Sequence, residues 1–365
     1  MSLRIVILGL SITSSWGNGH ATCYRGLVRE LTRRGHDVLF LERDKPWYAE
    51  QRDLPCPPYG KTRLYKSLGE LKRRFSDAVA NADCVMVGSY VPDGIQVSRW
   101  VLQTARGVTV FYDIDTPVTL AKLAQGDHEY ISPELIPCFS MYLSFTGGPT
   151  LEKLEQEYGS PMARAFYCSV DPTLYFPEAV TKRFDLGLLG TFSEDRQPAL
   201  ERLLIKPAKD WSEGRFVVAG PLYPDYIHWP GNVERIEHLP PTGHRRFYNA
   251  QRFTLNITRA EMIRAGYSPS VRLFEAAACG TPIISDYWPG LEEFLEPGYD
   301  VIVAQSPSEV LACLRELDER KLQAIGLRAR QRVLKQHTAA HRAAELESLI
   351  VNAGNKSHEA QRTEA

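Results

Sequence analysis

The segment GYSPSVRLFEAAACGTPIISD, Gly266 to Asp286, combines a helix start with charged residues at spacings suited to binding a nucleotide. Ser270 can cap a helix whose first amide groups face the carboxyl edge of a sheet, where such folds bind phosphates. Glu275 lies inside that helix, and its carboxylate can accept two hydrogen bonds from ribose hydroxyls. The alternative is that Arg272 and Glu275 pair on a solvated helix face, and their spacing does not separate the two interpretations.

A second candidate is the stretch GTFSEDR, which follows an apolar run at the start of the second half. Gly190 would let a diphosphate approach the backbone, and Arg196 can clamp its oxygens with a planar, permanently charged group. Alone, such a turn is more often a plain strand-to-helix loop, but it is predicted at the same sheet edge as Glu275. Arg259 is a further cation near that edge and ranks below Arg196 and Arg272.

The third candidate is a turn in WGNGHA, formed by Gly17, Asn18 and Gly19. The third glycine of a dinucleotide fingerprint would fall at Thr22, so that motif is broken. His20 lies at a helix start, where an imidazole can take a proton from a hydroxyl near neutral pH. The alternative is a histidine that caps or packs against its own helix.

The fourth candidate is YDIDTP, directly after an apolar run. Asp113 and Asp115 alternate, so one should face the cleft and the other the opposite side of the sheet. One of them can orient His20 or act as the base itself. The alternative is a turn in which Asp115 caps the helix that follows Pro117.

The elements that must position these side chains alternate between short apolar runs and amphipathic stretches. Expected strands are 4–10, 37–42, 84–88, 109–112, 185–189, 216–219, 254–257, 282–285 and 301–303. Expected helices are 21–34, 67–81, 96–104, 197–205, 242–250, 271–279, 291–294 and 307–319, followed by helical spacing over 322–349. Continuously apolar strands alternating with helices predict parallel sheets covered on both faces.

A length of 365 residues suggests two domains. The fold class predicted is α/β, with two Rossmann-like domains whose parallel sheets face a central cleft. The boundaries expected are a first domain over 1–170, a linker over 171–184 that carries Pro172 and Pro177, and a second domain over 185–330. A helix over 331–350 closes the second domain or crosses back to the first. The polar residues 351–365 are predicted to be disordered.

Composition excludes several classes of protein. A net charge of −1 with 24% charged residues removes the global case for nucleic-acid binding. Seven cysteines without a C-x-x-C pair argue against a disulfide framework and a zinc site. No stretch reaches the roughly 18 apolar residues of a membrane-spanning helix, so we expect a cytoplasmic protein, at most peripheral to a membrane. The basic run 61–74 is interpreted as a solvated helix face, and Trp211, Trp229 and Trp288 as packing residues.

The run LNITRAEMIRAGYSPSVRLFEAAACGTPIISD resembles the CgeB-like glycosyltransferase family. The likeness extends to GNGHATCYRGLVREL, FLERD and YDIDTPVTL, and the segment after Gly266 is similar to the donor-binding helix of GT-B glycosyltransferases. The resemblance implies a nucleoside-diphosphate sugar bound mainly by the second domain and an acceptor bound mainly by the first. It also implies that Glu275 takes the ribose. Many retaining relatives carry another glutamate eight positions earlier, where this chain has Tyr267, so the stereochemical class stays open.

The function expected is therefore transfer of a sugar from a nucleoside-diphosphate sugar to an acceptor hydroxyl, with no metal and no organic cofactor. The acceptor is open: a saccharide, lipid, protein or small molecule. Donor binding is assigned to Gly190, Arg196, Tyr267, Ser268, Ser270, Arg272 and Glu275, and the acceptor side to Gly17, Asn18, Gly19 and His20 with Asp113 or Asp115. The alternatives are a nucleotide-sugar epimerase, a catalytically silent nucleotide-sugar-binding protein and, less favoured, a dehydrogenase.

Overall fold

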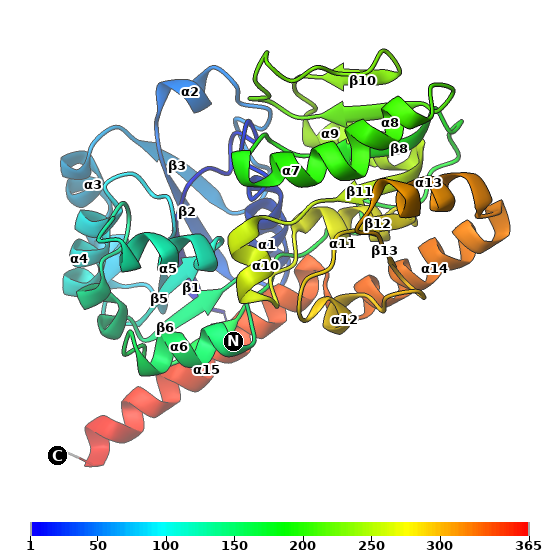
Figure 1. The fold of residues 1–365 in the computed structure, drawn as a ribbon. Coiled ribbons are helices and arrows are strands. Elements are labelled where there is room, and N and C mark those ends of the chain that lie inside the picture. Colours follow the sequence, from blue (N-terminus) through cyan, green and yellow to red (C-terminus); the bar gives the residue numbers. More distant parts are fainter. Residues whose placement is uncertain (1, 364–365) are drawn as a thin grey trace. The chain divides into compact units, whose positions relative to one another are not determined.

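The computed structural model describes residues 2–363, which form two compact α/β units (Figure 1). The first unit is the chain up to Cys168 together with the last helix, α15 (Ala339–Thr363). The second unit is Ser169–Thr338. Each contains one sheet of parallel strands with helices between them, which confirms the predicted α/β fold class.

The first sheet has seven strands in the order β3-β2-β1-β4-β5-β6-β7. The order reverses between β1 and β4, and ligands of open parallel sheets bind beyond the carboxyl ends of the strands at such a reversal. Three of these strands, β3, β6 and β7, were not predicted, because they are short or, like KTRLY in β3, largely polar. The strands are β1 (Arg4–Gly9), β2 (Asp37–Arg43), β3 (Lys61–Tyr65), β4 (Cys84–Gly88), β5 (Val108–Asp113), β6 (Met141–Ser144) and β7 (Ala163–Ala165).

Helices connect these strands. The basic run 61–74, interpreted as one helix face, is divided between edge strand β3 and helix α3, whose first amide groups are capped by Ser67. Helix α1 ends where Gly35 takes a φ of 89°, as the predicted stop signal requires. The helices are α1 (Ala21–Arg33), α2 (Pro46–Ala49), α3 (Leu68–Ala80), α4 (Gly94–Thr104), α5 (Thr116–Ala124), the 3-10 turn η1 (Pro133–Cys138) and α6 (Pro149–Gln156).

Helix α15 packs against α1 within the first unit. A Cβ atom on Gly26 would lie 2.9 Å from the Ala339 Cβ, so the absence of a side chain allows the two helices to approach closely. Arg34 at the end of α1 forms an ion pair with Glu347 at 2.5 Å. Instead of the predicted disordered tail over 351–365, α15 continues to Thr363, and residues 364 and 365 lie outside the described part.

The second sheet has six strands in the order β10-β9-β8-β11-β12-β13. Its order reverses between β8 and β11, where Thr254 pairs with Gly187. The loops that follow these two strands therefore leave the sheet side by side. Only β10, a short polar edge strand, was not predicted. The strands are β8 (Phe184–Leu189), β9 (Phe216–Ala219), β10 (Val233–Ile236), β11 (Gln251–Asn256), β12 (Ile283–Ser285) and β13 (Ile302–Val303).

Helices of the second unit include α11, which packs on α14. A Cβ atom on Gly326 would lie 2.1 Å from the Gly280 carbonyl oxygen, so this contact requires glycine. The helices are η2 (Glu194–Arg196), α7 (Gln197–Leu200), the π turn η3 (Glu201–Ile205), α8 (Lys206–Asp210), α9 (Pro241–Asn249), α10 (Ala260–Ala265), α11 (Val271–Ala278), α12 (Leu291–Phe294), α13 (Pro307–Glu316) and α14 (Glu319–Gln336).

The segment 171–184, predicted as a linker, belongs to the second unit by its contacts. The Glu178 amide donates to Asn249 Oδ1 at 2.9 Å, and Lys182 Nζ donates to the Asn249 carbonyl oxygen at 2.9 Å. All seven cysteines are free thiols. Within residues 2–363, no helix has both the length and the apolar character needed to cross a bilayer.

Candidate functional site

Two arginines meet where β8 and β11 end in the second unit. Arg272, on the first turn of α11, donates from Nε to the Leu189 carbonyl oxygen at 2.5 Å and from Nη1 to Asn256 Oδ1 at 2.8 Å. Arg196 follows β8 and donates to the Thr191 carbonyl oxygen at 2.5 Å. The fold thus brings GTFSEDR and the start of α11 together, although some 75 residues separate them in the sequence.

Both guanidinium groups line one small hollow that opens to solvent. A Cβ atom on Gly190 would lie 2.6 Å from Arg272 Nη2 and 3.6 Å from Arg196 Nη1. The absence of a side chain at this position therefore lets the two guanidinium groups lie close to the backbone. The hollow is lined by residues that include Gly190, Ser193, Arg196, Tyr223, Ile257 and Arg272.

The two cations share this space without a carboxylate hydrogen-bonded to either of them among the described residues. Burial, and after it the charge of Arg272, lower the pKa of Arg196 to about 10, so Arg196 stays charged at neutral pH. Arg259 differs, because its Nε lies 3.8 Å from Asp195 Oδ2. An anion bound in the hollow would relieve the repulsion between Arg196 and Arg272 and replace water at their N–H groups.

Helix α11 presents its amino terminus at the same edge. Ser270 occupies the N-cap position, but its side chain does not form the predicted cap. Its Oγ donates instead to Asn256 Oδ1 at 2.8 Å, and Ser268 before it is buried. The Ser270 side chain therefore does not satisfy an amide group of the first turn. Amide groups at the start of a helix favour the binding of anions.

Tyr267 has a left-handed backbone with a φ of 50°, which is uncommon for a side chain other than glycine. Its amide donates to the Pro289 carbonyl oxygen at 2.7 Å. A Cβ atom on Gly290 would lie 2.5 Å from the Tyr267 ring, so the ring lies directly against this glycine. The position at which relatives carry a glutamate is thus held by an aromatic ring in a constrained loop.

Glu275 is buried, with 3% of its surface exposed. Its Oε2 accepts a hydrogen bond from the Tyr248 hydroxyl at 3.0 Å and lies 3.6 Å from His244 Nδ1. Burial, followed by the Glu275 charge, raises the pKa of the neighbouring Tyr175 well above its usual value. Since Arg272 is also buried, the interpretation in which Arg272 and Glu275 form a pair on a solvated helix face is wrong.

In the first unit, His20 occupies the N-cap position of α1, and its side chain makes no capping hydrogen bond. Its Nδ1 is buried without a hydrogen-bond partner, and its ring centre lies 5.5 Å from that of Phe145. Burial lowers the pKa of His20 to about 4, so the imidazole is neutral at pH 7. The turn before it has Gly17 at a φ of 60° and Asn18 Oδ1 accepting from the His20 amide at 3.1 Å, while Gly19 is exposed.

The two aspartates lie in different environments. Asp113 is fully buried at the end of β5, accepts from the Tyr142 hydroxyl at 2.5 Å, and has its pKa raised by burial. Asp115 is only partly buried and accepts from the Tyr90 hydroxyl at 3.0 Å. Its side chain does not cap α5. Within the described residues no hydrogen bond joins His20 to either aspartate, so the predicted orienting contact is absent from this structure.

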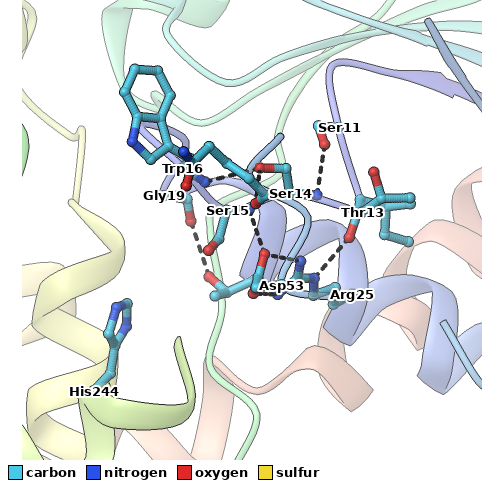
Figure 2. A network of polar contacts seen from close by, with 12 residues as sticks. Ser11, Thr13, Ser14, Ser15, Trp16, Gly19, Arg25, Asp53 and His244 are labelled. Atoms are coloured by element: carbon cyan, nitrogen blue, oxygen red, sulfur yellow. Dashed lines mark hydrogen bonds and ion pairs between the residues drawn. The ribbon is translucent and has the colours of Figure 1, made fainter. Parts of the chain in front are cut away.

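An ion pair that the sequence did not single out holds the loop between β1 and α1 (Figure 2). Arg25 Nη1 donates to Asp53 Oδ2 at 2.8 Å and Nη2 to Asp53 Oδ1 at 3.0 Å, while Nε donates to the Ile12 carbonyl oxygen. Asp53 also accepts from the Ser15 amide at 2.8 Å. Glu42, in the FLERD stretch, accepts from two further loop amides, those of Ile12 and Thr13. These partners lie 28 to 38 positions apart, and local spacing does not reveal them.

We expect Asp53→Asn to lower the free energy of unfolding by about 1 kcal/mol at pH 7, because the ion pair is partly screened by water. Burial raises the pKa of Asp53, but the hydrogen bond and charge of Arg25 outweigh it and hold the pKa below the usual 3.8. A lowered folded-state pKa stabilises the protein above pH 3.8, and this stabilisation is lost as the pH falls further.

Chemical denaturation at pH 7 and at pH 3 measures this difference, and Asp127→Asn, at an exposed site of the same unit, is the control. The difference in free energy of unfolding between wild type and Asp53→Asn should be smaller at pH 3 than at pH 7. An equal difference at both pH values would contradict the role given to the Asp53 charge.

Comparison with known proteins gives a family match and a shared fold. Residues 196–348 match the model of a family described as glycosyl transferase-like, whereas no curated protein matches the chain. Sucrose-phosphate synthase from Thermosynechococcus elongatus is 15% identical with a TM-score of 0.70, over 95% of this chain and 98% of that one.

Two further solved structures are similar over 96% of this chain and 100% of theirs. Anabaena HepE in complex with UDP-glucose is 14% identical with a TM-score of 0.72. An alpha-glucosyltransferase in complex with UDP-glucose and DNA containing an abasic site is 13% identical with a TM-score of 0.70. The narrower CgeB-like resemblance stays a prediction. The chain has the two-sheet α/β fold of GT-B glycosyltransferases, and most of its second unit matches a glycosyl transferase-like family.

Proposed function

We propose that this protein transfers a glycosyl group from a nucleoside-diphosphate sugar to a hydroxyl group of an acceptor. The observation that carries the proposal is the pair of guanidinium groups, Arg196 and Arg272, that line one hollow and have neutral hydrogen-bond partners. Glycosyl transfer releases a diphosphate, whose negative charge grows as the bond to the sugar breaks. Preorganised cations next to that diphosphate stabilise the transition state more than the ground state.

Arg272 and Arg196 would clamp the diphosphate oxygens, and amide groups at the start of α11, within Ser268 to Arg272 but not at Pro269, would add donors. The missing side chain of Gly190 leaves room for the Arg272 guanidinium to lie close to the backbone. In this proposal Tyr267 is part of the donor site. It occupies the position where the family resemblance implies a second glutamate. We propose that its ring contacts the sugar without adding a negative charge.

Glu275 would accept hydrogen bonds from the ribose. Burial and the Glu275 charge raise the pKa of Tyr248 well above its usual value, so this hydroxyl donates to the Glu275 carboxyl group and orients it. Two neighbours of similar fold are complexes with UDP-glucose. We therefore propose a uridine-diphosphate hexose as donor. The acceptor class stays open between saccharide, lipid, protein and small molecule.

His20 is the proposed base for the acceptor hydroxyl. It is neutral at pH 7, so its imidazole is in the form that can receive a proton. Asp115, being partly exposed, is the better of the two aspartates for contact with an acceptor, since Asp113 is fully buried. Gly17, Asn18 and Gly19 would shape the acceptor side of this loop.

The protonation state of His20 gives a pH prediction. Because the neutral form is the base and its pKa is about 4, the rate constant for transfer should be constant between pH 6 and 8 and fall only as the pH approaches 4. His20→Ala should lower kcat by about 100-fold or more across that range. An inflection near pH 6.5, or an unchanged kcat in both His20→Ala and Asp115→Asn, would contradict the acceptor-side assignment.

The function itself is tested by incubating the full chain with UDP-hexoses, with and without a panel of acceptors, and measuring both free UDP and the sugar product. A glycosyltransferase releases UDP faster when its acceptor is present. An epimerase converts the sugar without releasing UDP, and a silent binding protein does neither. Conversion of the sugar with no UDP release would overturn the proposal.

A further inference from the structure

Asn256, the last residue of β11, is fully buried beneath the hollow and lies at the centre of four hydrogen bonds. Its Oδ1 accepts from Arg272 Nη1 and from Ser270 Oγ, both at 2.8 Å. Its Nδ2 donates to Ser285 Oγ at 2.9 Å and to Thr258 Oγ1 at 3.3 Å. A single amide therefore connects the start of α11 with Thr258, which follows β11, and with Ser285 at the end of β12.

The orientation of this amide is determined by the layer behind it. The Ser285 hydroxyl donates to the Asp286 carbonyl oxygen at 2.8 Å, and the Thr258 hydroxyl donates to Asp286 Oδ1 at 2.7 Å. Each hydroxyl has one hydrogen, so towards Asn256 both can only accept. Asn256 must then direct its NH2 group at them and its oxygen at Arg272.

This arrangement orients the Arg272 guanidinium without a carboxylate hydrogen-bonded to it. The hydrogen-bond partners of the Arg272 guanidinium are the Leu189 carbonyl oxygen and the Asn256 amide oxygen, which are both neutral. An arginine that is buried to this extent is normally paired with a carboxylate, because an unpaired charge costs free energy. Here the positive charge of Arg272 adds to that of Arg196, which lines the same hollow.

We infer that Asn256 is a positioning residue that sets the charge selectivity of the donor site: it holds Arg272 in place while leaving its charge available to a diphosphate. The inference rests on the proposed function and assigns Asn256 no contact with the donor. An aspartate of the same shape would keep an acceptor beside Arg272 but would supply the negative charge that the diphosphate otherwise brings.

The test compares Asn256→Asp with wild type, using the full chain, for binding of UDP, uridine and inorganic pyrophosphate. We expect the affinities for UDP and pyrophosphate to fall about 10- to 100-fold, since an anion placed next to Arg272 opposes them. The affinity for uridine, which has no phosphate, should change less than about threefold. A merely structural role would instead weaken uridine and UDP by the same factor.

Asn256→Ser is the neutral counterpart, and it also serves if Asn256→Asp does not fold. Serine no longer orients Arg272 but adds no charge. UDP binding should therefore weaken less than in Asn256→Asp, and the affinity for uridine should change less than about threefold. Equal UDP-to-uridine ratios in wild type and the folded variants would overturn the role of Asn256 alone. If wild type binds neither UDP nor pyrophosphate, the two arginines are not an anion site, and the proposed function falls with this inference.

Discussion

Replacing Arg272 by methionine should weaken the binding of UDP by about 100-fold. Hydrogen bonds to a charged group contribute about 1.5–3 kcal/mol, and this arginine can offer more than one to a diphosphate. The substitution also removes the hydrogen bonds that Arg272 donates to the Leu189 carbonyl oxygen and to Asn256 Oδ1, so Asn256 Oδ1 keeps only the hydrogen bond from Ser270. Calorimetric titration with UDP measures the effect, and the thermal stability of the variant shows how much of it comes from damage to the fold.

Two variants make this prediction specific. Arg272→Lys keeps the charge but loses the planar fork, so it should recover only part of the affinity. Arg264→Met removes an exposed arginine of the same unit, whose partner is Glu261, and should leave UDP binding unchanged. UDP affinity that stays at the wild-type level in Arg272→Met would remove Arg272 from the donor site.

Glu275→Gln should abolish the preference for ribose over deoxyribose. In wild type we expect UDP to bind about 10-fold or more tightly than 2′-deoxy-UDP, because a buried carboxylate is left without its partner when the hydroxyl is missing. Glutamine has nearly the same shape but no charge, so the two ligands should bind almost equally. Glu275→Ala should weaken UDP binding more strongly, since it also leaves the Tyr248 hydroxyl without an acceptor.

The ratio of the two affinities is the deciding quantity, because damage to the fold would lower both. Glu293→Gln, at an exposed position of α12, is the matched control and should keep the wild-type ratio. A wild-type ratio in Glu275→Gln would contradict the assignment of Glu275 to the ribose.

Central strands of both sheets could be predicted where they are buried on both faces and form continuous apolar runs, as in β4 and β9. The edge strands β3, β7 and β10 were missed because they are short or, like β3, largely polar, and the short internal strand β6 was missed as well, whereas the edge strand β13 was predicted. Residues 351–355 were predicted to be disordered from their composition. They continue α15, where Leu346, Ile350 and Ala353 are buried at helical spacing.

Part of the candidate site was visible in the sequence and part was not. Arg196 and Arg272 were placed at one sheet edge because their predicted strands are parallel, and the structure brings them to one hollow. The spacing of residues in the sequence could not show that nearly all of α11 is buried. This burial rules out a solvated Arg272–Glu275 pair. The role of Asn256 depends on partners up to 29 positions away on other elements, so no local pattern carries it.

The donor-side proposal and the acceptor-side proposal rest on different observations. On the donor side, named atoms meet at hydrogen-bonding distance around one hollow. On the acceptor side, His20 and the aspartates each have a defined environment, but no hydrogen bond joins His20 to either aspartate in the described residues. The assignments for His20 and Asp115 therefore depend on kinetics, and those for Arg196 and Arg272 on binding.

The most direct test of the central claim, a nucleoside-diphosphate site between Arg196 and Arg272, is calorimetric titration of the full chain with UDP, GDP and ADP. The same titration is then made with the double variant Arg196→Ser and Arg272→Ser. Our account predicts that wild type binds at least one of these nucleotides, UDP most tightly, with one site per chain, and that the double variant loses this binding. Equal binding by the double variant, or no binding of any nucleoside diphosphate to a folded wild type, would contradict it.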